Sequence, residues 1–133
     1  MSSPSPSADL ARSLARRSRD DLDALVALHE LAGIADAIIG FHAQQAVEKA
    51  LKAAIVNAGG ELHRTHDLRF LVKQASGLTI VLPKEVTEAQ WLTPWAVELR
   101  YDEYLEEPLD RALAVQAAGA AVAIAERLVA PDD

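Results

Sequence analysis

Apolar side chains recur at helical spacing along most of this chain, and glycine or proline separates each such segment from the next. In residues 8–32, leucine and valine side chains fall within one half of a helical wheel, while arginines and acids share the other half. Gly33, Gly59-Gly60 and Gly77 end successive segments. The pattern predicts a series of amphipathic helices that must bury their apolar faces against one another.

The expected helices are 8–32, 34–58, 68–75, a fourth opened by Pro83 and interrupted at Thr93-Pro94, and 109–128. Thr93 can instead cap a continuation to Leu99. Residues 78–82 resemble a strand locally, but no partner strand exists, so we expect an apolar connector packed on the helices. The presence of 26 alanines and only 6 glycines also favours helix. The predicted fold is all-α, an antiparallel up-down bundle of four or five helices.

Length and composition limit the organisation of the chain. Its 133 residues suit a single domain, expected at 8–130 after a Ser/Pro-rich disordered tail at 1–7. No run of about 18 apolar residues is present, and no signal-peptide core follows the tail, so we expect no membrane segment. The absence of cysteine excludes a disulfide scaffold and a thiol nucleophile. Together these features favour the cytoplasm.

Acidic residues gather in the second half of the chain. The formal net charge is −7, and residues 74–133 carry all of it. The stretch from Glu98 to Asp110 contains six acidic residues and one basic residue, Arg100. This balance argues against a basic nucleic-acid-binding module. The favoured interpretation of the acidic stretch is a solvated acidic loop. The alternative is a surface that prefers a binding partner of one sign of charge.

The second expected helix has one side of mostly small apolar residues and one polar side. The polar side chains fall within an arc of roughly 160°; they are His42, Gln44, Gln45, Glu48, Lys49 and Lys52. The spacing of four residues predicts contacts from Gln44 to Glu48, from Gln45 to Lys49 and from Glu48 to Lys52. We favour a charged outer face. The alternative is a surface that contacts phosphate or a partner helix.

Several motifs resemble the HEPN family (higher eukaryotes and prokaryotes nucleotide-binding). They are FHAQQAVEKALKA at 41–53, the following N-A-G-G turn, Thr65-His66-Asp67-Leu68, and WAVELRY at 95–101. The resemblance covers about residues 8–130 and implies a five-helix bundle that dimerises. It also implies a minimal nucleotidyltransferase as partner, often in a two-gene toxin–antitoxin pair.

The sequence departs from the ribonuclease members of that superfamily. Those proteins resemble one another in an Arg-x4–6-His motif, whereas the histidines here, at 29, 42, 63 and 66, do not follow an arginine at that spacing. Acids follow Arg100, and their carboxylates would repel an RNA phosphate. RNA cleavage is therefore disfavoured. The favoured hypothesis is a non-catalytic HEPN homodimer that works with a nucleotidyltransferase and binds a nucleotide through a surface of Gln45, Lys49, Lys52, Arg100 and Tyr101.

Two alternatives stay open. One is a divergent HEPN ribonuclease toxin with a site around His42, His66 and Arg100. The other is a purely structural dimerisation module. Arg100 is equally well explained by an ion pair with a carboxylate such as Glu48.

The remaining candidate residues have structural explanations. His63-x-x-His66 lacks a third metal ligand nearby, so we expect no metal or cofactor. Thr65 or Asp67 can cap the third helix. Asp67 in the first turn complements the helix dipole, and we expect His66 to hydrogen-bond a neighbouring helix. His29 is expected to be a core histidine. Trp91, Trp95 and Leu99 recur at a spacing of four, which favours core or dimer packing over base stacking.

Overall fold

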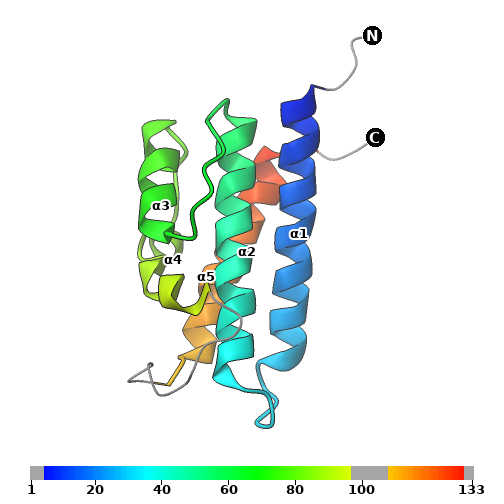
Figure 1. The fold of residues 1–133 in the computed structure, drawn as a ribbon, viewed down its shortest axis with the longest axis vertical. Helices are drawn as coiled ribbons and strands as arrows, with labels where there is room; N and C mark the ends of the chain where they lie inside the picture. The colour runs from blue at the N-terminus through cyan, green and yellow to red at the C-terminus, as the bar shows by residue number, and fades with distance from the viewer. Residues whose placement is uncertain (1–4, 97–107, 131–133) are drawn as a thin grey trace.

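A computed structural model describes residues 5–96 and 108–130. The helices are α1 (Pro6–Leu28), α2 (Asp36–Asn57), α3 (Leu68–Gly77), the one-turn α4 (Lys84–Thr87), the 3₁₀ helix η1 (Ala89–Ala96) and α5 (Arg111–Leu128). These two ranges contain no strand, so the predicted all-α class is confirmed. Helix α1 runs antiparallel to α2, but α3 and α5 run in the same direction as α2, so the predicted up-down order is wrong after the first two helices (Figure 1).

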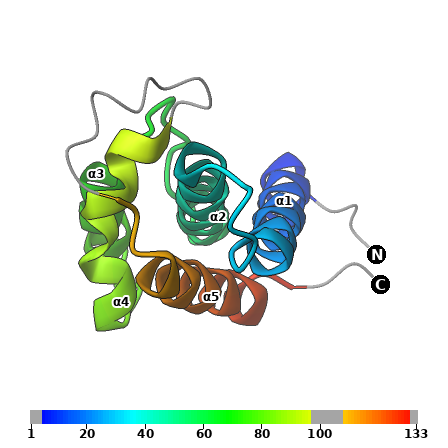
Figure 2. The same cartoon turned by 90° about the horizontal axis from the view of Figure 1, so that it is seen from below.

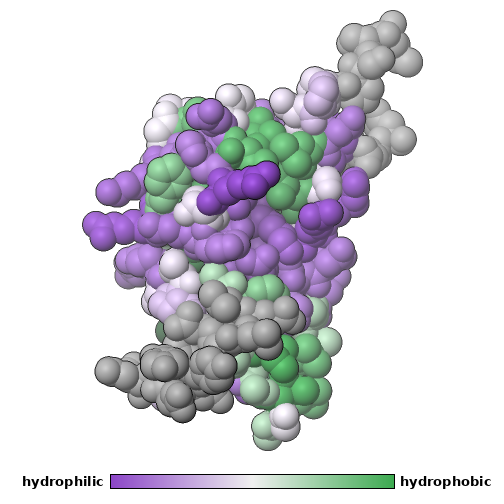
Figure 3. All heavy atoms as spheres, in the orientation of Figure 1, coloured by the Kyte–Doolittle hydropathy of each residue, from purple (hydrophilic) through white to green (hydrophobic). Residues whose placement is uncertain are grey.

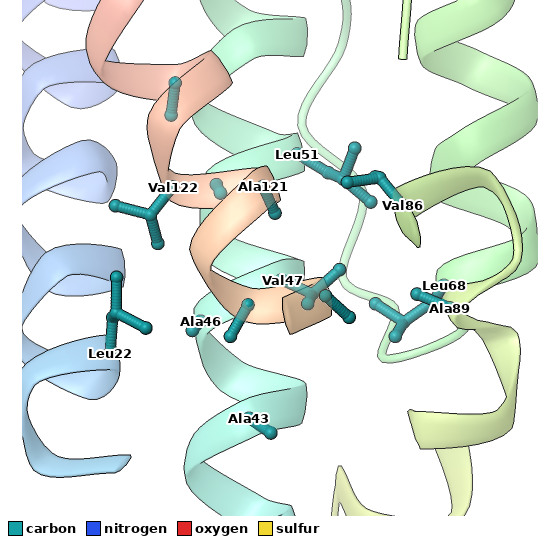
Figure 4. Packing of buried hydrophobic residues seen from close by; sticks show 14 of the residues in the cluster. Leu22, Ala43, Ala46, Val47, Leu51, Leu68, Val86, Ala89, Ala121 and Val122 are labelled. Carbon is teal, nitrogen blue, oxygen red and sulfur yellow. The ribbon is translucent and has the colours of Figure 1, made fainter. Parts of the chain in front are cut away.

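Helix α2 occupies the centre of the bundle. It packs against α1 and α5 on one side and against α3 and η1 on the other (Figure 2). Buried alanines line both α2 and α5 where these helices pack, among them Ala43, Ala46 and Ala121 (Figure 4). Because alanine adds only a methyl group, the two helix backbones can approach closely. The core therefore surrounds α2 on most sides.

Capping side chains set where α1 and α5 begin. Helix α1 begins two residues before the expected position, because the Ser5 side chain accepts a hydrogen bond from Ala8 N and Pro6 occupies the first turn. It ends at Leu28 rather than near Ala32. Helix α5 begins at Arg111 rather than Leu109, since Asp110 is its N-cap.

The segment after α3 forms the predicted apolar connector. Thr79 adopts a left-handed conformation with φ of 60°, and Ile80 N donates to Ala75 O at 3.1 Å. Leu78, Ile80 and Leu82 pack partly buried against the core. This bent path lets the short segment cover the helices without a strand partner.

The fourth expected helix is broken earlier than predicted. The chain leaves the α-helical form after Thr87, and Pro94 lies inside η1 rather than at the interruption. The missing donor of Pro94 therefore costs no α-helical hydrogen bond. Thr93 Oγ1 accepts from Leu68 N at 3.2 Å, so it supports the start of α3 instead of capping a continuation. The continuation to Leu99 lies outside the described residues from position 97 onward.

Candidate functional site

The polar side of α2, which we call the α2 polar face, comprises His42, Gln44, Gln45, Glu48, Lys49 and Lys52. Its middle is buried, since Gln44, Gln45 and Glu48 are 0%, 9% and 4% exposed. The expectation of an outer, solvated face is wrong for these three residues. The cause is tertiary, because α1 borders one edge of this face and the segment leading into α3 borders the other (Figure 1). Figure 3 shows a hydrophilic band across the middle of this side of the molecule.

Asp21 of α1 binds the first edge of the α2 polar face. Its Oδ1 accepts from His42 Nδ1 at 3.0 Å, and its Oδ2 accepts from Lys49 Nζ at 2.7 Å. The sequence analysis did not single out Asp21. A signal existed, because Asp21 follows Leu14 by seven residues and precedes Leu25 by four, which places a carboxylate in the middle of the apolar side of α1.

Glu48 forms the hydrogen bonds at the opposite edge of the α2 polar face. Its Oε1 accepts from His66 Nδ1 at 2.7 Å and from Gln44 Nε2 at 2.9 Å, and its Oε2 accepts from Lys52 Nζ at 2.9 Å. The predicted contacts of Glu48 with Gln44 and Lys52 are thus confirmed, as is the bond from His66 to a neighbouring helix.

Both glutamines of the α2 polar face belong to the Glu48 group. Gln45 Nε2 donates to Gln44 Oε1 at 2.7 Å, and Lys49 is bound to Asp21, so the predicted pairing of Gln45 with Lys49 is wrong. The competing partner on α1 could not be recognised from positions within one helix. Two separate hydrogen-bonded groups therefore hold the α2 polar face, one centred on Asp21 of α1 and one centred on Glu48 that reaches His66 before α3.

Hydrogen bonding keeps Glu48 ionised despite its burial. Burial by itself raises the pKa of this carboxyl, but hydrogen bonds from Gln44, Lys52 and His66, together with the charge of Lys52, lower the pKa below its ordinary value. The two lysines of the face are matched by two carboxylates, Asp21 and Glu48. Each ammonium uses one of its three N–H donors in its bond to a carboxylate, so donors remain for a ligand.

The structure brings together some of the predicted site residues and separates others. Gln45, Lys49 and Lys52 share the α2 polar face. His42 and His66 lie on its opposite edges, one held by α1 and the other preceding α3, with α2 between those helices (Figure 2). Arg100 and Tyr101 lie outside the described residues.

The other two histidines have local partners. His29 is the C-cap of α1, and its Nδ1 donates to Val26 O at 2.9 Å; it is partly exposed rather than a core residue. The His63 ring meets the Phe70 ring edge-on at 5.0 Å. Of the two predicted caps, Thr65 and Asp67, Asp67 is the one that caps α3, and its side chain accepts from Arg69 N at 3.0 Å. In the part of the chain that the structure describes, no three metal-ligating side chains come together.

A separate groove lies between α4, η1 and α5. It has a volume of about 380 Å³ and is lined by Lys84, Glu85, Glu88, Trp91, Leu113, Gln116 and Ala117. None of these residues belongs to the α2 polar face. Trp95 is buried as predicted, whereas Trp91 is 36% exposed at this groove.

Comparison with known proteins gives one match. The family model described as HEPN domain matches residues 11–131, a range that begins inside α1 and continues past the end of α5. No curated protein and no solved structure matches the chain. Among residues 5–96 and 108–130, no helix has both the length and the apolar character needed to cross a membrane.

Proposed function

The chain belongs to the HEPN domain family. Because it also lacks the Arg-x4–6-His motif, we propose that it is a non-catalytic HEPN protein. In this proposal it acts in the cytoplasm as a homodimer with a minimal nucleotidyltransferase partner, as one member of a toxin–antitoxin-like pair. Its α2 polar face receives a nucleotide, with Gln45, Lys49 and Lys52 as contacts and Arg100 and Tyr101 contributing from the segment after η1.

The observation that carries the nucleotide site is the way in which its lysines are held. Buried carboxylates bind Lys49 at 2.7 Å and Lys52 at 2.9 Å, and both ammonium groups keep donors for phosphate oxygen atoms. Because these side chains are ordered before a ligand arrives, binding costs less conformational entropy than binding by free lysines.

Calorimetry with ATP tests the nucleotide site. We expect Lys49→Gln and Lys52→Gln each to weaken binding about tenfold, which corresponds to about 1.4 kcal/mol. Lys73→Gln, at an exposed position of α3, is the matched control and should bind as the wild type does. Unfolding curves of the variants verify that the fold is intact. Absence of heat with the wild-type protein would contradict this part of the proposal.

Co-expression tests the partner. The product of an adjacent nucleotidyltransferase gene should co-purify with this chain. Alone, the chain should elute in light-scattering chromatography with twice the 14.3 kDa mass of one copy. A monomer that captures no such enzyme would contradict the assembly.

A ribonuclease is the second candidate, and one observation favours it. Buried carboxylates bind Nδ1 of both His42 and His66, an arrangement that orients an imidazole for general acid or base catalysis. Because the two rings lie on opposite edges of α2, each would act with another group, such as Arg100.

RNA cleavage in vitro and growth arrest on expression test this candidate. Activity that Arg100→Ala abolishes would support it, and an inert wild-type protein would exclude it. A dimer with neither nucleotide binding nor nuclease activity would assign the chain to the third alternative, a structural dimerisation module.

A further inference from the structure

His66 combines a buried partner with an open ring. Its side chain is 64% exposed, yet its Nδ1 lies 2.7 Å from Oε1 of Glu48, whose side chain is only 6% exposed. Gln44 Nε2 also donates to the backbone oxygen of His66 at 3.1 Å. Two bonds from α2 therefore hold this residue in place while one side of its imidazole faces solvent.

The other three histidines lack this combination. His42 also has a buried carboxylate partner, but its side chain is only 26% exposed. His29 donates to a backbone carbonyl. His63 lies 3.7 Å from the exposed carboxylate of Glu61, which can move freely in solvent. The structure thus distinguishes one histidine from the rest by geometry.

The bond to Glu48 determines which ring nitrogen of His66 carries the proton. An ionised carboxylate only accepts hydrogen bonds, so the neutral imidazole must carry its hydrogen on Nδ1. The lone pair is then on Nε2, which makes no hydrogen bond within the described residues and belongs to a side chain that is 64% exposed. Such a nitrogen is a nucleophile at a fixed position.

We propose that His66 is a phosphoryl-accepting nucleophile. The Nε2 lone pair attacks an electrophilic phosphorus, an N–P bond forms, and the bond to the leaving group breaks with its electron pair. The leaving group is a nucleoside diphosphate when the donor is a nucleoside triphosphate, and ammonia when the donor is phosphoramidate. The proton on Nδ1 stays, and Glu48 offsets the positive charge that develops on the ring. Lys52, on the other oxygen of Glu48, supplies a cation beside the incoming phosphoryl group.

The experiment treats the full chain with potassium phosphoramidate and, in parallel, with γ-labelled ATP and Mg²⁺. Peptide mapping at alkaline pH locates the acid-labile phosphohistidine. We expect His66 to react about tenfold faster than the other histidines and Glu48→Gln to remove that advantage. His66→Gln should lose the modification, and His63→Gln should keep it.

Equal rates at all four histidines, or an unchanged rate at His66 in a folded Glu48→Gln variant, would overturn the proposal. If that variant fails to fold, nitrogen NMR of the wild type tests the proposal instead. A neutral His66 that carries its hydrogen on Nε2 would also overturn the proposal. Label from ATP identifies a nucleoside triphosphate as donor, whereas label from phosphoramidate alone identifies a small phosphoramidate-type donor. Only the ATP measurement rests on the proposed nucleotide site, so failure of that site and failure of the nucleophile are distinguishable.

Discussion

At the scale of single residues, Glu48 has the largest influence on the α2 polar face. It is 4% exposed and binds Gln44, Lys52 and His66 simultaneously. A buried ion pair adds little net stability when intact, but removal of one partner leaves the other charge without compensation. Glu48 is therefore more important for keeping its neighbours in place than for the energy of any one bond.

We predict that Glu48→Gln lowers the free energy of unfolding by about 2–3 kcal/mol at neutral pH, because the partly buried ammonium of Lys52, with a side chain 12% exposed, loses its counter-charge. Urea unfolding measures the change. Glu126→Gln is the matched control, since Glu126 pairs with Arg19 at the surface with a side chain that is 42% exposed, and should cost less than about 1 kcal/mol. Equal losses in the two variants would contradict the role assigned to burial.

The pH dependence of this loss has a definite sign. The pKa of Glu48 in the folded protein lies below its ordinary value of 4.5, so its stabilising contribution is full above that value. The contribution disappears as the pH falls through the lower, folded-state pKa. Unfolding free energies measured from pH 7 downward should show the difference between wild type and Glu48→Gln persisting to about pH 5 and then shrinking. A difference that grows in acid would refute this account.

At the scale of elements, close approach of Trp95 to α2 requires a glycine. A Cβ on Gly40 would lie 2.4 Å from the Trp95 ring, whereas a Cβ on Gly119 in α5 would meet nothing within 4 Å. Alanine substitutions at these two positions therefore distinguish the cost of a steric clash from the gain in helix propensity.

We predict opposite effects of the same substitution at these two glycines. Gly119→Ala should stabilise the protein by up to about 1 kcal/mol, because alanine is the better helix former. Gly40→Ala should destabilise it by about 1–3 kcal/mol, because Trp95 must move. Thermal or urea unfolding measures both variants. Stabilisation by Gly40→Ala would mean that Trp95 is not packed as the structure places it.

Arg111 joins the start of α5 to the turn between α1 and α2. Its guanidinium donates to Asp36 Oδ1 at 2.9 Å and to the backbone oxygens of His29, Leu31 and Ile34. One side chain thus provides donors for three carbonyls that the turn leaves without helical partners.

We predict that Arg111→Ala lowers the free energy of unfolding by about 2–4 kcal/mol, and that Arg111→Lys recovers only part of it, because an ammonium lacks the planar fork of donors. Chemical denaturation measures both variants. Arg127→Ala, at an exposed position in the last turn of the same helix, should change stability by less than about 0.5 kcal/mol. Full recovery by lysine would show that charge alone matters.

At the scale of the whole molecule, the central place of α2 sets the order of local stability. Three other helices and η1 pack against it, whereas the N-terminal turn of α1 is exposed at Ser7 and Leu10. Segments with more burial open less often. Hydrogen exchange should therefore be slowest for the amides of α2 and fastest for the first turn of α1 among the helices. Faster exchange in α2 than in α5 would contradict this order.

Much of this architecture is predictable because its causes are local. Helical periodicity and the glycines after helical segments predicted the long helices to within a few residues at most ends. The same spacing predicted the contacts of Glu48 with Gln44 and Lys52, since residues four apart on one helix are neighbours in any fold. The HEPN resemblance followed from those motifs and is confirmed over residues 11–131.

Long-range partners were decided only by the tertiary structure. Lys49 binds Asp21 of α1 rather than Gln45, and Gln44 is fully buried although its helix position resembles a solvated one. The periodicity of one helix shows which side chains share a side, but not which other element covers that side. The sequence by itself therefore determined the helices and their family. The packing of α1 and of the segment before α3 around α2 turned a polar stripe into two hydrogen-bonded groups with buried carboxylates, because buried polar groups must find partners wherever the fold supplies them.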